Sequence, residues 1–343
     1  YLDNPRLFKE RPAIKKITSG VSHFSLSPSR KLLAIANKNN TVKVLDTDGQ
    51  LILETTKPFN SPINRILWSP ESENFLVFAG RKIYSFNALD KNKNYSLLNI
   101  KYPKDIVWDP RIPNRVLIQT QTNNLVAYHI SSKASTVLAQ NITSFAPSAR
   151  SIFAVSENNI SEISLLGHLL KNYTINSQEN IKEILVTPTS NVALLFDSGT
   201  LSVFKTDNNQ LLQIANNVQK AGWSPDGQSL YFQTDPMSIH VYNAFNERLP
   251  YIPLHQEKLI LRLSREITHP QWFAGGHHLI YQTGDEIKIT EVDTRDYPIT
   301  FTVDSTDLGN CQCDVGPDGT AIFYLKDTEN SSDLMVAQIA DKS

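Results

Sequence analysis

The sequence contains little cysteine and little glycine, the residues on which small disulfide-rich domains and glycine-rich nucleotide-binding loops depend. It has 2 cysteines in 343 residues, which excludes a disulfide framework. Cys311 and Cys313 lie two residues apart on one predicted strand, so they are poorly placed to bridge each other. Without a second cysteine pair, we expect no structural zinc site. Glycine, at 13 residues, is about half of the usual share of ~7%, which argues against glycine-rich phosphate loops.

Charge of one sign and long apolar runs are missing too. The 33 Lys and Arg residues against 34 Asp and Glu residues leave a net charge of −1, so we expect no bulk attraction to nucleic acid. No apolar run reaches the ~18 residues of a membrane helix, so we expect no direct membrane insertion. The chain begins at Tyr1 rather than Met, and we expect any targeting segment or membrane anchor to lie upstream.

What the sequence does contain is a short pattern that recurs about every forty residues. Each copy has an apolar or aromatic residue, a small residue and then proline, and we call it the anchor. The third positions of the anchors are 28, 70, 110, 147, 188, 225, 274 and 317, where position 274 has alanine instead of proline. A steady period near forty residues is in the range expected for propeller blades.

Each anchor is followed by β-forming runs. An apolar run of about six residues comes first, then a short polar loop, then a run that alternates apolar and polar residues. The first runs are Lys31–Ala36, Asn74–Ala79, Arg115–Thr120, Ser151–Ser156, Val192–Asp197, Ser229–Thr234, His278–Thr283 and Ala321–Lys326. Alternation of this length is typical of strands, and a further apolar run usually ends each unit. Each unit is therefore predicted to be a four-stranded antiparallel meander.

Eight anchors predict an all-β fold, a β-propeller of eight four-stranded blades in a single domain over residues 1–343, with seven blades as the alternative. The last unit, Asn310–Ser343, contains only three strand runs, whereas an orphan run, Pro12–Thr18, precedes the first anchor. We expect this N-terminal run to pair with the last blade as its outer strand, which closes the ring and removes a sheet edge. The extra stretch Asn246–Glu266 is predicted to be an outer strand or a flap.

The turns that follow two anchors carry a family resemblance. Ser224–Gly227 (SPDG) and Gly316–Gly319 (GPDG), each before an apolar strand, resemble the WD40-like repeats of TolB-type bacterial proteins. The unit PQWFAGGHHLIYQTGDEIKI from Pro270 is more loosely similar to propellers attached to PEGA-type domains of bacterial envelope proteins. The second resemblance implies a propeller outside the cytoplasm, tethered through an upstream anchor; a cytoplasmic location is the alternative. The Gly-His and Trp-Asp dipeptides of ordinary WD40 repeats do not recur at their usual places.

Motifs for catalysis or cofactor binding are absent from the sequence: it has no G-x-S-x-G, H-E-x-x-H, P-loop or G-x-G-x-x-G. The single His pair, His277 and His278, adjoins a strand, where neighbouring side chains point to opposite faces and cannot readily share a metal. We therefore predict no catalytic residue, no metal ligand and no cofactor. The anchor tryptophans Trp68, Trp108, Trp223 and Trp272 are expected to pack between blades.

One column of the repeat, five residues before each third anchor position, is polar. It contains His23, Arg65, Asp105, Ile142, Glu183, Lys220, His269 and Gln312. Apart from Ile142, we take these residues as candidate binding residues, because in a propeller they fall where the first strand enters the central channel. The alternative is that they only hydrogen-bond to one another and to water. We call these seven the polar column.

Three functions are compatible with this pattern. The first hypothesis is a non-enzymatic, monomeric interaction module that binds a protein or peptide, which the resemblance places in the bacterial envelope. The second is a sensor that binds a small molecule or glycan at the channel mouth. The third is an enzyme, such as a lyase or hydrolase, with a metal in the channel. Because the charges of the polar column nearly cancel, the sequence does not specify the partner.

Overall fold

The computed structural model describes the chain except for residues 1–7, 10, 56, 91–94, 176, 247–251, 274, 296–297, 306–311, 317–318, 328–331 and 341–343. The regular elements of the described residues are 32 strands, which form eight four-stranded antiparallel sheets. We call each sheet a blade and number the blades in the order of their anchors. The anchor residues 274 and 317, and the cysteine at 311, lie outside the described residues.

The chain divides into two compact units. Unit 1 contains Tyr1–Ile100, Ile267–Glu291 and Ile299–Ser343, and unit 2 contains Lys101–Glu266 and Val292–Pro298. Each is described by itself below. The organisation as one domain stays a prediction. Within the described residues, no helix is long and apolar enough to span a membrane.

Unit 1 contains blades 1, 2, 7 and 8. Blades 1 and 2 consist of β2 (Val21–Leu26), β3 (Leu32–Asn37), β4 (Val42–Asp46) and β5 (Leu51–Glu54), and of β6 (Ile63–Trp68), β7 (Asn74–Ala79), β8 (Lys82–Asn87) and β9 (Tyr95–Leu97). Blades 7 and 8 consist of β26 (Ile267–Trp272), β27 (His278–Thr283), β28 (Glu286–Glu291) and β29 (Thr300–Ser305), and of β30 (Cys313–Val315), β31 (Ala321–Asp327), β32 (Ser332–Gln338) and β1 (Ala13–Ser19).

Unit 2 contains blades 3 to 6. Blades 3 and 4 consist of β10 (Asp105–Trp108), β11 (Arg115–Gln119), β12 (Leu125–His129) and β13 (Ser135–Ala139), and of β14 (Ser144–Pro147), β15 (Ser151–Ser156), β16 (Asn159–Ser164) and β17 (Leu169–Thr174). Blades 5 and 6 consist of β18 (Ile181–Val186), β19 (Val192–Phe196), β20 (Leu201–Lys205) and β21 (Gln210–Ala215), and of β22 (Lys220–Trp223), β23 (Ser229–Gln233), β24 (Ser238–Asn243) and β25 (Glu257–Arg262).

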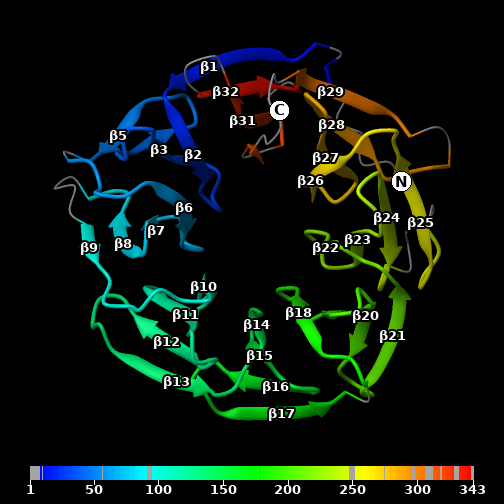
Figure 1. Ribbon diagram of the computed structural model, residues 1–343. Helices are drawn as coiled ribbons and strands as arrows, with labels where there is room; N and C mark the ends of the chain where they lie inside the picture. The colour runs from blue at the N-terminus through cyan, green and yellow to red at the C-terminus, as the bar shows by residue number, and fades with distance from the viewer. Residues whose placement is uncertain are drawn as a thin grey trace. The chain divides into compact units, whose positions relative to one another are not determined.

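The predicted closure of the fold is confirmed. The N-terminal strand β1 pairs with β32 in antiparallel register, from Ala13 opposite Gln338 to Ser19 opposite Asp333. Figure 1 shows this strand, in blue, beside the red C-terminal strands of blade 8. The described residues form eight four-stranded sheets, which agrees with the prediction of eight blades rather than with the alternative of seven. The extra stretch before blade 7 supplies β25 as an outer strand, although its residues 247–251 lie outside the described part.

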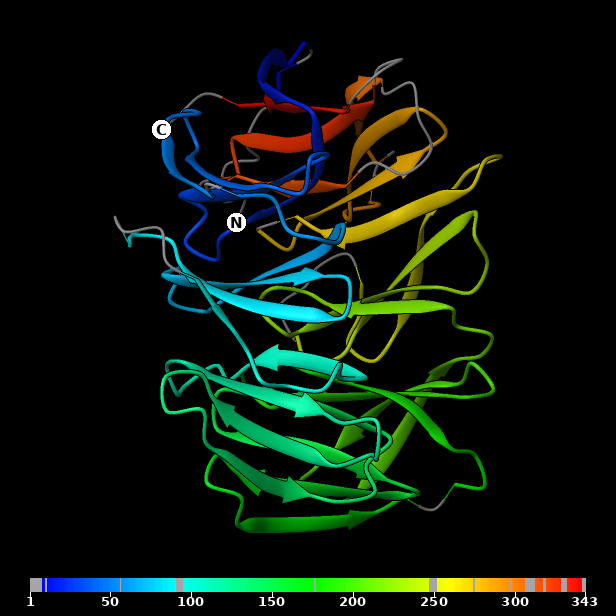
Figure 2. The same cartoon turned by 60° about the vertical axis from the view of Figure 1, so that its left-hand side comes forward.

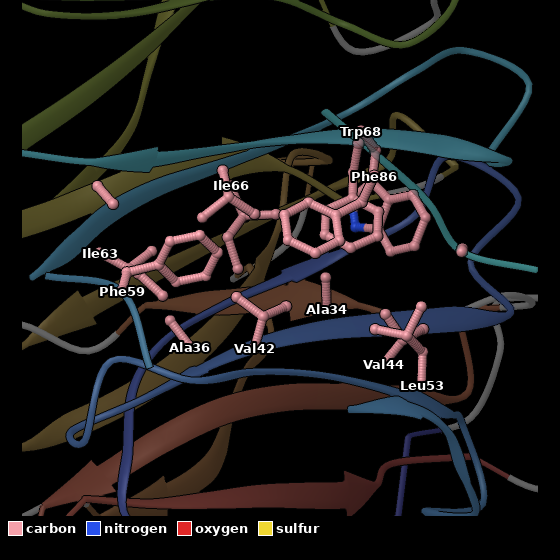
Figure 3. Packing of buried hydrophobic residues seen from close by; sticks show 14 residues of the cluster. Ala34, Ala36, Val42, Val44, Leu53, Phe59, Ile63, Ile66, Trp68 and Phe86 are labelled. Atoms are coloured by element: carbon pink, nitrogen blue, oxygen red, sulfur yellow. The ribbon is translucent and has the colours of Figure 1, made fainter. Parts of the chain in front are cut away.

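The hydrophobic cores lie between the faces of neighbouring blades. In unit 1, Ala34, Val42 and Val44 of blade 1 pack against Ile66, Phe75 and other residues of blade 2, and these side chains are at most 5% exposed. Figure 3 shows several of these side chains filling the space between the two sheets. In unit 2, blades 3 and 4 stack in the same way, as Figure 2 shows for the blue-green sheets. Each blade therefore buries its faces against its neighbours within the unit.

Local hydrogen bonds explain why the anchor motif recurs before the second strand of a blade. The middle residue of the motif carries a hydroxyl in four copies, and in the three serine copies this hydroxyl accepts a hydrogen bond from the N–H that begins the next strand. Ser69 Oγ accepts from Asn74 N at 3.1 Å, and Ser224 Oγ accepts from Ser229 N at 2.9 Å. The serines are at most 5% exposed, so this bond satisfies polar groups that are shielded from water. In the SPDG turn, Gly227 has φ +69°, the left-handed conformation that glycine adopts without strain.

Candidate functional site

The structure places the polar column at the start of the first strands, and β-bulges interrupt the pairing there. The register shifts between Val21 and His23 in blade 1, between Ile63 and Arg65 in blade 2, and between Ile181 and Glu183 in blade 5. A bulge bends its strand and re-aims the side chains beside it, and bulges are frequent next to binding sites. Sequence periodicity did not predict these bulges.

In unit 1, the members of the polar column have different environments. Burial lowers the pKa of His23, which favours its neutral form. The Arg65 guanidinium lies 5.3 Å from the centre of the Phe78 ring, a cation–π distance. Gln312 binds the backbone of Phe24 through both ends of its amide, because its Nε2 donates to the carbonyl and its Oε1 accepts from the N–H. Gln312 therefore joins blade 8 to blade 1.

His269, also in unit 1, has an unusual backbone. Its φ is +51°, and it lies within the register shift between Thr268 and Gln271 of β26. Left-handed backbone is uncommon for a residue with a side chain, and it occurs here in an exposed position. The structure thus marks this member of the column as a local exception, where the strand leaves regular pairing.

In unit 2, the acidic members of the polar column influence each other. Burial raises the pKa of Glu183, and the nearby Asp105 carboxylate raises it further, while Lys182 lowers it. Burial also raises the pKa of Tyr231 to about 12, with a contribution from Glu183. Asp105 Oδ1 accepts a hydrogen bond from Ile106 N at 2.8 Å. Tyr231, which the sequence analysis did not select, therefore belongs to the surroundings of Glu183.

Lys220, the basic member in unit 2, is exposed at the start of β22. Among the described residues it forms no ion pair with Glu183 or Asp105. In unit 2 the column thus contains two acidic residues and one lysine.

A pocket that the sequence analysis missed lies in unit 1, at the ends of the first strands. Its volume is about 320 Å³. The side chains around it come from β2, β6, β26, β30 and the turns that follow them; Ser25, Leu67, Gln271 and Asp314 occupy the same position of the repeat, three residues before the third anchor position. In the other repeats this position holds Val107, Ser144, Leu185 and Gly222, so Asp314 is its one charged member. An acid in an otherwise uncharged column is a signal that the sequence did contain.

Two of the four anchor tryptophans, Trp68 and Trp223, join neighbouring blades, as predicted. Trp68 Nε1 donates to the carbonyl of Ser25 at 2.9 Å, and Trp223 Nε1 donates to the carbonyl of Leu185 at 3.1 Å. Both acceptors occupy the repeat position of Asp314, in the preceding blade. A tryptophan that is buried with its N–H bonded serves packing and fixes the spacing of the strands that line the pocket.

Comparisons with known proteins find similarity in structure only. No model of a protein family matches the chain, and no curated protein matches its sequence. The C-terminal WD40 domain of Sif2 superposes with a TM-score of 0.67 at 12% identity, over 95% of this chain and 99% of that one. The β-propeller domain of Cps50 (Swd1) from Myceliophteria thermophila gives a TM-score of 0.56 at 10% identity, over 96% of this chain and 100% of that one.

A third solved structure, Hsv2 from Kluyveromyces lactis, gives a TM-score of 0.57 at 12% identity, over 80% of this chain and 93% of that one. Identities this low establish a shared fold and nothing about ligand or partner. The eight four-stranded sheets of the described residues and the similarity to these solved structures indicate the same fold. The chain has an all-β, WD40-type β-propeller fold with eight blades.

Proposed function

We propose that the chain is a non-enzymatic interaction module that binds a protein or peptide partner through its polar column. The fold supports this proposal because WD40-type propellers commonly serve as protein-interaction scaffolds. The observation that carries it is the coincidence of polar side chains with β-bulges on the first strands of blades 1, 2 and 5. The bulges lie at the same repeat position in all three blades.

Peptide selection tests this proposal. Peptides selected from a random library on the unmodified chain are measured against a variant that carries Arg65→Ala, Glu183→Ala and Lys220→Ala. We expect a loss of affinity of at least about tenfold, because hydrogen bonds to charged groups typically contribute about 1.5–3 kcal/mol. The matched control carries Lys38→Ala, Lys57→Ala and Glu157→Ala, which removes two bases and one acid at exposed positions that are not part of the column. Equal affinity of the two triple variants for the selected peptides would contradict the proposal.

We propose further that this module acts as a monomer in the bacterial envelope, tethered through a segment upstream of Tyr1. The support is the resemblance of the SPDG and GPDG turns to TolB-type repeats, together with the looser resemblance of the seventh unit to PEGA-associated propellers. Fractionation of cells that express the full-length gene product tests the location, and analytical ultracentrifugation tests the monomer. Recovery of the protein in the cytoplasmic fraction alone would refute the envelope role.

A further inference from the structure

The pocket of unit 1 brings together charged and aromatic groups that the proposed function does not use. Blades 7, 8, 1 and 2 are joined around it by polar contacts. Gln271 Nε2 donates to the carbonyl of Cys313 at 3.0 Å, and Leu26 N donates to Asp314 Oδ2 at 3.3 Å. Together with the Trp68 indole bond to Ser25, these contacts fix the first strands of the four blades relative to one another. Strands that are hydrogen-bonded to one another therefore form the walls of the pocket.

Asp314 is the charged group in the wall of this pocket. Its carboxylate is largely buried, and the Leu26 N–H is its hydrogen-bond donor among the described residues. Burial raises the pKa of Asp314 to about 6, even though the Leu26 bond and the Arg30 charge both lower it. The Leu26 bond and the Arg30 charge thus offset only part of the cost of burying this carboxylate. A ligand that brings a cation would offset more of it.

Arg30 also lines the pocket but does not neutralise Asp314. Its Nη1 donates to the carbonyl of Gly316 at 3.1 Å. Within the described residues, no ion pair joins Arg30 to Asp314. Cys313, the neighbour of Asp314, has its pKa raised to about 12 by burial and stays neutral. Arg30 is thus the charged group that faces Asp314, and its guanidinium is held toward a backbone carbonyl.

Two tryptophans complete the lining of the pocket. Trp272 of blade 7 and Trp68 of blade 2 both line the pocket. In the order of the blades, blades 8 and 1 lie between them. Trp68 is 5% exposed, packs against Phe75 and donates its N–H to Ser25, so it forms an apolar wall of the pocket. We propose that this pocket binds a cationic nitrogen group, an ammonium or guanidinium, with Asp314 as its hydrogen-bond acceptor and the tryptophans as its walls. The group belongs either to a small amine or to a Lys or Arg side chain of a peptide.

This inference is independent of the proposed function, since the pocket and the polar column occupy different repeat positions. The experiment is a ligand-observed NMR titration of the full chain with four probes. Butylamine and ethylguanidine represent small amines, and acetylated, amidated Gly-Gly-Lys-Gly-Gly and Gly-Gly-Arg-Gly-Gly represent peptides. The peptide with norleucine in place of lysine is the neutral control. We expect at least one cationic probe to bind and the norleucine peptide not to bind. Absence of binding by all four cationic probes up to millimolar concentration overturns the proposal.

The pH dependence and two substitutions assign binding to Asp314. An ammonium keeps its proton well above pH 7, so the titrating group is the Asp314 carboxyl, which must be ionised to bind a cation. We expect affinity to fall about tenfold between about pH 7.5 and about pH 5, because a carboxyl with pKa near 6 is mostly protonated at the lower pH. Asp314→Asn keeps an acceptor for Leu26 N and removes the charge, so it should weaken binding at least about tenfold and abolish the pH dependence.

Arg30→Gln separates a purely cationic ligand from a zwitterionic one. If the ligand is only cationic, removal of the Arg30 charge relieves repulsion, and affinity should rise severalfold. A loss of affinity would mean that Arg30 contacts an anionic part of the ligand, which contradicts the proposal. Unchanged affinity of Asp314→Asn, with an unfolding transition like that of the unmodified chain, also contradicts it.

Discussion

At the scale of single residues, the anchor of blade 3 is the one that carries a charged residue, Asp109, at its middle position. Asp109 Oδ2 accepts from Arg115 Nε at 2.9 Å and from Arg115 Nη2 at 2.5 Å. Asp109 Oδ1 accepts from the N–H groups of Arg111 and Ile112. Asp109 is 1% exposed and Arg115 is 9% exposed, so the ion pair is shielded from water.

Asp109→Ala should therefore destabilise the fold by about 3–5 kcal/mol, because it leaves a buried guanidinium without its partner. Arg115→Met should cost less, since the two backbone N–H groups still stabilise the Asp109 carboxylate. Urea unfolding at neutral pH measures both variants. A cost for Arg115→Met that equals or exceeds the cost for Asp109→Ala would show that the backbone bonds do not hold the carboxylate as described.

His278 of blade 7 is a second residue whose environment has a measurable consequence. Burial lowers its pKa to about 4, and the neighbouring His277 adds to this. Its Nε2 lies 4.0 Å from Glu291 Oε1, which is too long for a hydrogen bond that would oppose the shift. In the unfolded chain His278 has its ordinary pKa of 6.5, whereas in the folded chain its pKa is about 4. Between these two pH values His278 is therefore protonated more often in the unfolded state than in the folded state.

The contribution of His278 to stability is thus fully present above its unfolded pKa and is lost as the pH falls from 6.5 toward about 4. The loss should reach about 3 kcal/mol. His278→Gln should remove this part of the pH dependence, whereas His168→Gln, at an exposed position, should leave it unchanged. Urea unfolding of both variants across this pH range tests the assignment, and identical pH dependences would refute it.

At the scale of elements, the N-terminal segment does more than add an outer strand. Phe8 lies upstream of β1, the strand that pairs with β32. Phe8 contacts blade 7, where its ring centre lies 5.6 Å from that of Phe273 and 4.9 Å from that of Phe301. Lys9 N donates to the carbonyl of Ile339 at 2.7 Å. The segment therefore covers the edge of blade 8 and connects it to its neighbour, a protection against edge-to-edge aggregation.

Phe8→Ala should destabilise the chain by about 3 kcal/mol, because it leaves a cavity among aromatic rings. Leu169→Ala on β17 is the matched control, since Leu169 is 64% exposed and its loss should have an effect below about 0.5 kcal/mol. Thermal unfolding compares the two. A similar small shift of Tm for both variants would show that the Phe8 contact does not stabilise the closure.

The strands divide by how well the sequence predicted them. Asn74–Ala79, Ser151–Ser156 and His278–Thr283 are strands with the bounds predicted, because the second strand of a blade is buried on both faces and reads as an apolar run. Fourth strands are less visible; β9 is three exposed residues. Bulges on the first strands were not predictable from periodicity, because they depend on how the strand fits its partner.

At the scale of the whole molecule, the sequence predicts a single domain over residues 1–343. If this is correct, calorimetry of the full chain should show one unfolding transition, because every blade relies on its neighbours to bury its faces. The ratio of the van't Hoff to the calorimetric enthalpy should then be close to one. Two resolved transitions would mean that the two compact units unfold separately and that the single-domain prediction is wrong.

The sequence by itself favoured eight blades over seven and predicted their order and the closure by the N-terminal strand, because a period near forty residues and an orphan strand are properties of the chain. It also contained the polar column and the acid at Asp314. Only the tertiary structure decided which residues meet. Ser25, Leu67, Gln271 and Asp314 are far apart in the chain, and they share one pocket because their blades pack side by side in unit 1. Burial in that pocket, which no linear pattern encodes, is what raises the pKa of Asp314.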